Sequence, residues 1–68
     1  MDKFKIDTQY LVTYPLLPNP MLIEITDVTE KCYKVLRQNG FRTWEMKDEM
    51  DNDWKIIEEL SEKRPIDR

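Results

Sequence analysis

Apolar and polar residues alternate along much of the chain, and this period of two predicts β-strands. Within residues 21–29, Ile23 and Ile25 fall on one side of an extended segment and Glu24 falls on the other. Asp27 interrupts the apolar side, and Val28 restarts it on the opposite phase. A change of phase inside one strand indicates a β-bulge or a bend near Asp27. Residues 32–38 alternate again and predict the next strand.

The dipeptide Asn39-Gly40 separates two alternating segments and predicts a β-hairpin. It favours a two-residue type I′ loop, in which both loop residues need a positive φ. Because a hairpin loop sets the register of its strands, this loop predicts four cross-strand pairs. They are Gln38 with Phe41, Leu36 with Thr43, Val35 with Trp44, and Tyr33 with Met46. The last two pairs are expected on the buried face, with Trp44 as the central core residue. The predicted core consists of large apolar residues from several segments: Ile23, Ile25, Tyr33, Val35, Trp44, Met46 and Ile56.

The first twenty residues predict an extended N-terminal segment and a connector. Residues 10–14 are rich in β-branched and aromatic side chains, which favour a short strand. Three prolines between Pro15 and Pro20 exclude a helix interior and predict a stiff, extended chain. Leu16 and Leu17 are apolar, so at least one of them is expected to pack against the core. We expect a single domain with a β core over residues 21–60 and a flexible tail over residues 61–68.

The segment after residue 47 leaves two interpretations open. A short helical turn is predicted near Asp48, and residues 54–60 then fit either a strand or a helix. As a helix from about Asp53 to Lys63, with Asp53 as N-cap, the chain aligns Met50, Trp54, Ile57 and Leu60 on one stripe. The predicted fold is mainly β, a small antiparallel barrel or curled sheet of about five strands with one short helical turn. The alternative is α+β, a hairpin sheet with a C-terminal helix.

Composition narrows the chemistry open to a chain of 68 residues. The chain has no histidine, one cysteine and one glycine. These counts exclude a disulfide within the chain, a Cys/His zinc site, a histidine-activated nucleophile and a glycine-rich phosphate loop. A chain this short also has little room for a substrate cleft. We therefore expect a non-enzymatic protein with no cofactor. The charged start and the absence of a long apolar run favour the cytoplasm.

Several short motifs resemble a known family. Val28-Thr29-Glu30-Lys31 and Tyr33-Lys34-Val35 precede the Asn-Gly hairpin, Trp44 follows it, and Trp54-Lys55-Ile56-Ile57-Glu58 comes last. This order is similar to that of small SH3-like β-barrel proteins of phages and prophages, and the likeness covers about residues 22–60. The resemblance implies a closing strand over residues 55–59. Its motifs are structural and bring no catalytic or binding residue with them.

Negative charge is concentrated in one part of the sequence. The chain has a formal net charge of −3, whereas residues 45–62 contain eight acidic and two basic residues. Five of these acidic residues form the candidate protein-binding face for a basic partner: Glu45, Asp48, Glu49, Asp51 and Asp53. A local excess of charge accelerates association with an oppositely charged partner. Divalent metal binding and a solvated turn are the other interpretations, and the motif lacks the glycine and the spacing of an EF-hand loop.

A nucleic-acid-binding surface is the alternative function from a different class. The candidate residues lie on or next to the two hairpin strands: Lys31, Lys34, Arg37 and Arg42. Basic side chains can meet phosphates, and an exposed aromatic ring can stack on a base. The acidic total opposes this interpretation, because binding to nucleic acid without sequence preference depends on a positive surface. Cys32 follows Lys31, which can lower the pKa of a thiol, although a packing role is the simpler interpretation.

Overall fold

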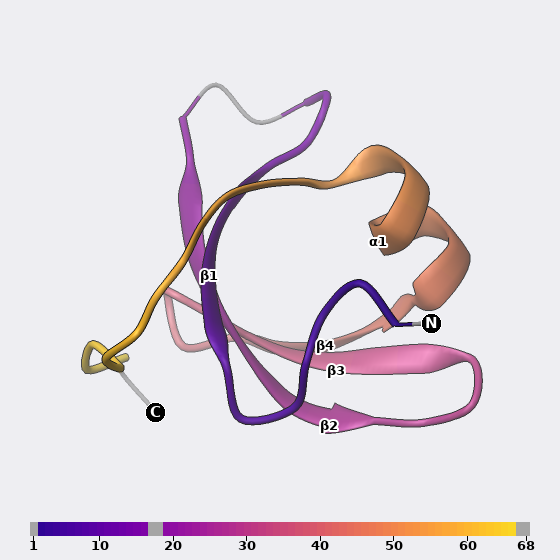
Figure 1. The fold of residues 1–68 in the computed structure, drawn as a ribbon, viewed down its shortest axis with the longest axis horizontal. Coiled ribbons are helices and arrows are strands. Elements are labelled where there is room, and N and C mark those ends of the chain that lie inside the picture. The colour runs from indigo at the N-terminus through magenta and orange to yellow at the C-terminus, as the bar shows by residue number, and fades with distance from the viewer. Residues whose placement is uncertain (1, 17–18, 67–68) are drawn as a thin grey trace.

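A computed structural model describes residues 2–16 and 19–66, which form one curled antiparallel sheet with a short helix (Figure 1). The strand order is β4-β3-β2-β1-β5, and β4 and β5 are the two edges. The strands are β1 (Gln9–Thr13), β2 (Met21–Val28), β3 (Cys32–Arg37), β4 (Arg42–Met46) and β5 (Lys55–Glu59), and the helix is α1 (Lys47–Asp53). The prediction of a mainly β curled sheet with one helical turn is confirmed. The barrel is not closed, because β4 and β5 do not pair in the part of the chain that is described.

The alternative with a C-terminal helix is wrong. Residues Lys55–Glu59 form β5, which pairs antiparallel with β1 from Tyr10–Glu59 to Thr13–Lys55. The free edge of β1 offers these residues backbone partners outside their own segment, and this outweighs the helix propensity of the glutamates. The predicted short helix does form before β5. Asp48 and Glu49 lie in its first turn, and Met50 is its buried residue. Carboxylates in the first turn favour the positive end of the helix dipole.

The core fills the concave side of the sheet. Phe4 packs edge-on against Tyr10 and Tyr33, with ring centroids 5.0 and 5.4 Å apart, and all three side chains are fully buried. Ile23, Ile25, Tyr33 and Val35 are buried as predicted, and Ile56 packs against them partly buried. The same cluster contains buried residues that the alternation did not identify: Phe4, Tyr10, Val12, Met21, Met50 and Trp54.

The predicted hairpin register is wrong by one residue. Lys34, not Val35, pairs with Trp44, and Tyr33 pairs with Glu45. The cause is the loop: Arg37 N–H donates to the Phe41 carbonyl, so three residues rather than two connect the strands. Gly40 has a φ of 90°, and Asn39 has no positive φ. This geometry is typical of a type I turn followed by a glycine bulge rather than of a type I′ turn.

The shifted register moves two predicted core residues to the outer face. A slip of one residue turns every side chain of a strand to the opposite side of the sheet. Trp44 is consequently 53 % exposed and Met46 is 46 % exposed, while Thr43 and Glu45 face inward. Trp54, which the alternation left ambiguous, is buried in the core with 6 % exposure. A change of phase near Asp27 is confirmed, since the β2–β3 register shifts between Ile25 and Asp27.

The segments outside the sheet make specific contacts with it. Leu16 is 91 % exposed and does not pack on the core, and Leu17 lies outside the described residues. The amide of Gln9 donates to the Arg64 carbonyl at 2.7 Å and accepts from the Arg64 N–H at 2.7 Å. Ile66 is buried. The C-terminal residues up to 66 are thus fixed to β1 through the side chain of Gln9.

Candidate functional site

Several carboxylates lie close together at the end of the sheet, where β4 leads into α1. Asp48 and Asp51, two of the five predicted acidic residues, line an open hollow of about 430 Å³. Asp2 and Glu30, which sequence reasoning did not include, line it as well. Its remaining lining residues are Lys31, Met46 and Lys47. We call this cavity the acidic hollow. Asp2 and Glu30 lie far from α1 in sequence, so only the folded chain brings them to the site.

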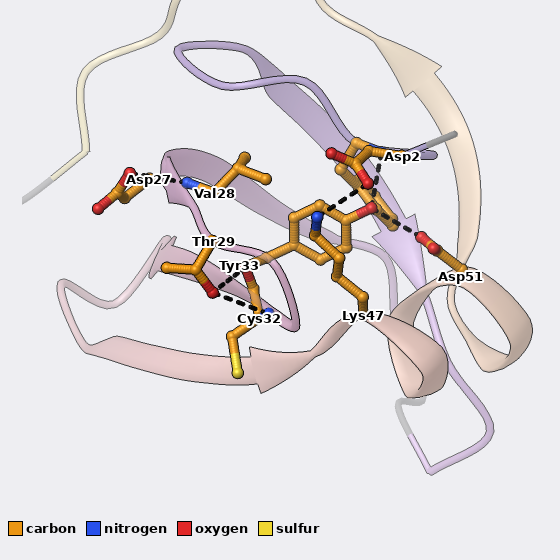
Figure 2. Close-up of polar contacts among 9 residues, drawn as sticks. Asp2, Asp27, Val28, Thr29, Cys32, Tyr33, Lys47 and Asp51 are labelled. Carbon is orange, nitrogen blue, oxygen red and sulfur yellow. Dashed lines mark hydrogen bonds and ion pairs between the residues drawn. The ribbon is translucent and has the colours of Figure 1, made fainter.

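One wall of the acidic hollow is held by a network around Tyr33 (Figure 2). The Tyr33 hydroxyl donates to Asp51 Oδ1 at 2.9 Å and accepts from the Phe4 N–H at 3.4 Å. Lys47 Nζ lies 2.9 Å from Asp2 Oδ1 and 5.6 Å from the centre of the Tyr33 ring. Burial, together with the Asp51 carboxylate, raises the pKa of Tyr33 to about 12, against a lowering by the Phe4 hydrogen bond. The hydroxyl therefore stays protonated and keeps Asp51 in place at neutral pH.

Two carboxylates of the acidic hollow remain open to a ligand. Glu30 and Asp48 are exposed, and neither has an ion-pair partner in residues 2–16 and 19–66. Lys31 is exposed on the rim, whereas Lys47 is already paired with Asp2. The free carboxylates give the hollow the chemistry to accept an ammonium or guanidinium group.

The remaining predicted acidic residues lie elsewhere. Glu45 points to the inner face, where its carboxylate lies 3.0 Å from the Arg37 guanidinium. Glu49 and Asp53 are exposed on α1 outside the acidic hollow. Asp53 lines a separate hollow of about 290 Å³ with Lys55 and residues 13–15. The five predicted residues are therefore not one contiguous site.

The predicted basic residues also separate into different environments. Arg37 is on the inner face, where it bonds to Glu45 and to the Tyr14 hydroxyl and lies 5.4 Å from the Trp54 ring centre. It thus holds the core together and is turned away from the outer surface. Lys34 and Arg42 are on the outer face, and Lys34 Nζ lies 5.5 Å from the centre of the exposed Trp44 ring.

A second charged hollow lies on this outer face. Lys34 and Arg42 line a space of about 270 Å³ together with Thr26 and Asp27. Asp27 Oδ1 accepts a hydrogen bond from the Val28 N–H, so part of its charge is engaged locally. We call this space the basic hollow. The sequence identified Lys34 and Arg42 as candidates. It placed Trp44, which lies beside them, in the core, because it predicted a hairpin loop of two residues instead of three.

Metal and thiol chemistry were two further interpretations of the chain's sequence. Its residues 2–16 and 19–66 contain no group of three or more His, Cys, Asp or Glu side chains placed to hold a metal ion. Cys32 is half-buried, with its Sγ 3.8 Å from the Met46 Sδ. Its N–H donates to Thr29 Oγ1 at 3.0 Å and closes the β2–β3 turn, which Figure 2 also shows.

Comparison of the chain with protein-family models, with curated protein sequences and with solved structures found no match. The resemblance to small SH3-like phage proteins therefore stays a prediction. In the described residues, no helix has both the length and the apolar character that crossing a bilayer requires.

Proposed function

We propose that this protein is a non-enzymatic protein-binding module that receives a basic side chain of its partner in the acidic hollow. The observation that carries the proposal is the convergence of four carboxylates, from Asp2, Glu30, Asp48 and Asp51, on one open cavity. Two of them, on Glu30 and Asp48, form no ion pair in the part of the chain that is described, although Lys31 and Lys47 line the same hollow. A lysine or arginine of a partner would offset part of this negative charge.

Charge alone would raise the rate of association with a partner but would add little affinity. An exposed ion pair contributes only about 0.2–1 kcal/mol, because water and salt screen it. Affinity therefore requires apolar contact beside the charges. Met46 lines the acidic hollow and is 46 % exposed, so it offers that contact at the same place.

The wider setting of the proposal follows from the sequence. A chain without histidine has no imidazole to activate a serine or cysteine nucleophile, which supports a binding role. A cytoplasmic location and an origin among SH3-like phage or prophage proteins complete the proposal. The single curled sheet, with its helix between β4 and β5, is compatible with that origin.

Nucleic-acid binding is the second candidate, and one observation favours it. Lys34, Arg42 and the exposed Trp44 share the outer face. Two observations oppose it: Arg37 is engaged on the inner face, and the net charge is −3. Lys34 Nζ also lies over the Trp44 ring, where a base would stack. We therefore rank it below protein binding.

The test is a pull-down from a bacterial lysate with three tagged proteins. One is the parent, one carries Glu30→Lys and Asp48→Lys, and the control carries Glu49→Lys and Asp53→Lys. Both variants change the net charge equally, and all four positions are exposed, so the fold should persist. We expect one protein to be retained by the parent and the control and lost from the variant of the acidic hollow. Equal loss from both variants would show a general charge effect and would reject the hollow as the site.

A further inference from the structure

Strand β4 is an edge whose outward backbone groups have no partner within residues 2–16 and 19–66. The bonds from Arg37 N–H to the Phe41 carbonyl and from Lys47 N–H to the Lys31 carbonyl show which residues of β4 bond to β3. Antiparallel pairs alternate between bonded and non-bonded, so Phe41, Thr43 and Glu45 direct their backbone groups toward β3. The backbone of Arg42 and Trp44, and the N–H of Met46, therefore face the open edge.

The side chains of these same residues lie on the outer face. Arg42, Trp44 and Met46 are all exposed, and Trp44 and Met46 are two of the large apolar side chains left open to solvent. Edge strands usually carry a device that blocks pairing, such as proline, a bulge or an inward charge. The other edge, β5, has one, because its register with β1 shifts between Ile56 and Glu58. Strand β4 keeps a regular register along its whole length and contains no proline, and its inward charge, on Glu45, is paired with Arg37.

Charges of opposite sign lie at the two ends of β4. At its start, Arg42 and Lys34 line the basic hollow. At its end, Met46 lines the acidic hollow, which contains Asp48. The strand rise of about 3.3 Å per residue separates Arg42 from Met46 by about 13 Å. Trp44 lies between them. A ligand that matches this strip carries a carboxylate at one end, apolar residues in the middle and a cation at the other end.

We propose that β4 binds an extended segment of a partner protein as an added antiparallel strand. The segment places a carboxylate opposite Arg42 and apolar side chains opposite Trp44 and Met46. Its direction follows from the antiparallel pairing: the basic residue comes first in the sequence and the acidic residue comes last, with one residue between each of the four contacts. Main-chain hydrogen bonds supply affinity in this mode, and alternate side chains supply specificity. Only the basic end of the segment rests on the function proposed above, because it occupies the acidic hollow.

A second copy of the chain fits this edge less well than such a segment. If two β4 strands paired about Trp44, Arg42 would lie opposite Met46 rather than opposite a carboxylate. If they paired about Glu45, Arg42 would lie opposite Asp48 and Trp44 opposite Met46. Asp48 belongs to α1, however, so the added strand would end after Met46 and only Trp44 and Met46 would pair through their outward backbone groups. If β5 of another copy docked instead, its bulge would interrupt the added pairs. The start of α1 therefore shortens the pairing with a second copy, whereas an extended segment of a partner can pair along the whole of β4.

The probe is the acetylated and amidated peptide Lys-Thr-Val-Thr-Val-Thr-Glu, titrated into the full chain and followed by backbone amide NMR shifts. We expect saturable shifts at Arg42, Trp44 and Met46. N-methylation of the second valine and of the glutamate, whose N–H groups would donate to the Trp44 and Arg42 carbonyls, should weaken binding at least about tenfold through lost hydrogen bonds. N-methylation of the two threonines that flank the first valine is the matched control and should have little effect. Equal sensitivity, or no shifts at millimolar peptide, would overturn strand addition.

Side-chain variants separate the two ends of the segment. Arg42→Glu should weaken binding about tenfold or more, because two carboxylates would face each other, and a peptide with lysine in place of glutamate should restore it. Trp44→Ala should weaken the binding of both peptides. The double variant Glu30→Lys and Asp48→Lys should weaken binding of the parent peptide and leave binding of a peptide without the lysine unchanged. If the double variant binds the peptide as the parent does, while Arg42→Glu and N-methylation weaken binding, the acidic hollow is rejected as a binding site and strand addition is retained.

Two further measurements test other occupants of β4. A single-stranded oligonucleotide that shifts Lys34, Arg42 and Trp44 at lower concentration than the peptide would assign the face to nucleic acid and overturn the proposal. Sedimentation of the parent and of Trp44→Ala tests self-association. A dimer of the parent that Trp44→Ala dissociates would assign the edge to a second copy and would likewise overturn it.

Discussion

The two tryptophans provide a direct test of the hairpin register. Trp54 is 6 % exposed, its ring stacks on Tyr14 with centroids 4.7 Å apart, and the Arg37 guanidinium lies 5.4 Å from its centre. Trp44 is 53 % exposed and has Lys34 Nζ 5.5 Å from its centre. We predict that Trp54→Ala destabilises the protein more than Trp44→Ala. A two-residue hairpin loop would instead bury Trp44 and predict a loss for Trp44→Ala as large as that for a buried tryptophan.

The magnitudes follow from burial. Truncating a buried tryptophan costs about 3–5 kcal/mol, because a cavity remains in the core. Full burial of a large apolar side chain contributes about 1.5–3 kcal/mol, so a half-exposed ring contributes about half of that. The contact of Trp44 with Lys34 adds about 0.5–1 kcal/mol. The expected loss for Trp44→Ala is therefore about 1–2.5 kcal/mol.

The assay is urea unfolding, followed by far-ultraviolet circular dichroism and by the fluorescence of the remaining tryptophan. A domain of this size has a free energy of unfolding of about 3–10 kcal/mol, so Trp54→Ala can unfold the chain completely. Trp54→Phe is the milder second variant and should still cost more than the same substitution at the exposed position, Trp44→Phe. The reasoning is refuted if Trp44→Phe lowers the unfolding midpoint more than Trp54→Phe. Blue-shifted emission from the Trp44 that remains in folded Trp54→Phe would also contradict its exposure.

Three further predictions concern the loop, the buried hydroxyl and the C-terminal segment. Gly40→Ala should cost about 1–2 kcal/mol in urea unfolding, because a side chain at a φ of 90° is strained; an unchanged midpoint would contradict the loop geometry. The raised pKa of Tyr33 stabilises the fold fully below pH 10, and this contribution should be lost as the pH rises toward 12, because the folded state binds the proton more tightly. Unfolding measured across that range should show the decline in the parent and a weaker one in Tyr33→Phe, and identical profiles would refute it. Removal of residues 63–68 should cost about 2–5 kcal/mol, because it takes away the buried Ile66, the Lys63–Glu24 ion pair and the Arg64 bonds to the Gln9 amide, and amide hydrogen exchange of β1 should then accelerate; unchanged protection would show that the C-terminal segment contributes little.

Local patterns predicted most of the elements and little of their long-range arrangement. Alternation and β-propensity located the strands, and the interrupted alternation at Asp27 located a shift that the β2–β3 register confirms. The acidic first turn and Met50 were compatible with the short helix that forms. Asn39-Gly40, however, is compatible with loops of two and of three residues. Only the packing of Tyr33 and Val35 against the core decides which face of β4 turns inward.

The candidate site shows the same division. Asp48 and Asp51 were identifiable from their local charge, whereas Asp2 and Glu30 reach the acidic hollow only through tertiary contacts. The Lys47–Asp2 ion pair and the burial of Phe4 draw the first residues across the end of the sheet. No local pattern in residues 2–4 indicates this, because a single aromatic residue near a terminus has no period to measure.

The pairing of β1 with β5 also constrains how the chain folds. Tyr10 pairs with Glu59, so the first strand gains its second neighbour only once the last strand is present. The β2–β3–β4 meander, in contrast, joins residues that are close in sequence and costs less loop-closure entropy. We expect the meander to form early and the β1–β5 contact to limit the folding rate, as in other chains dominated by distant contacts. During synthesis on the ribosome, the hydrophobic residues of β1 and of the N-terminal segment would then stay exposed until the last strand has been made.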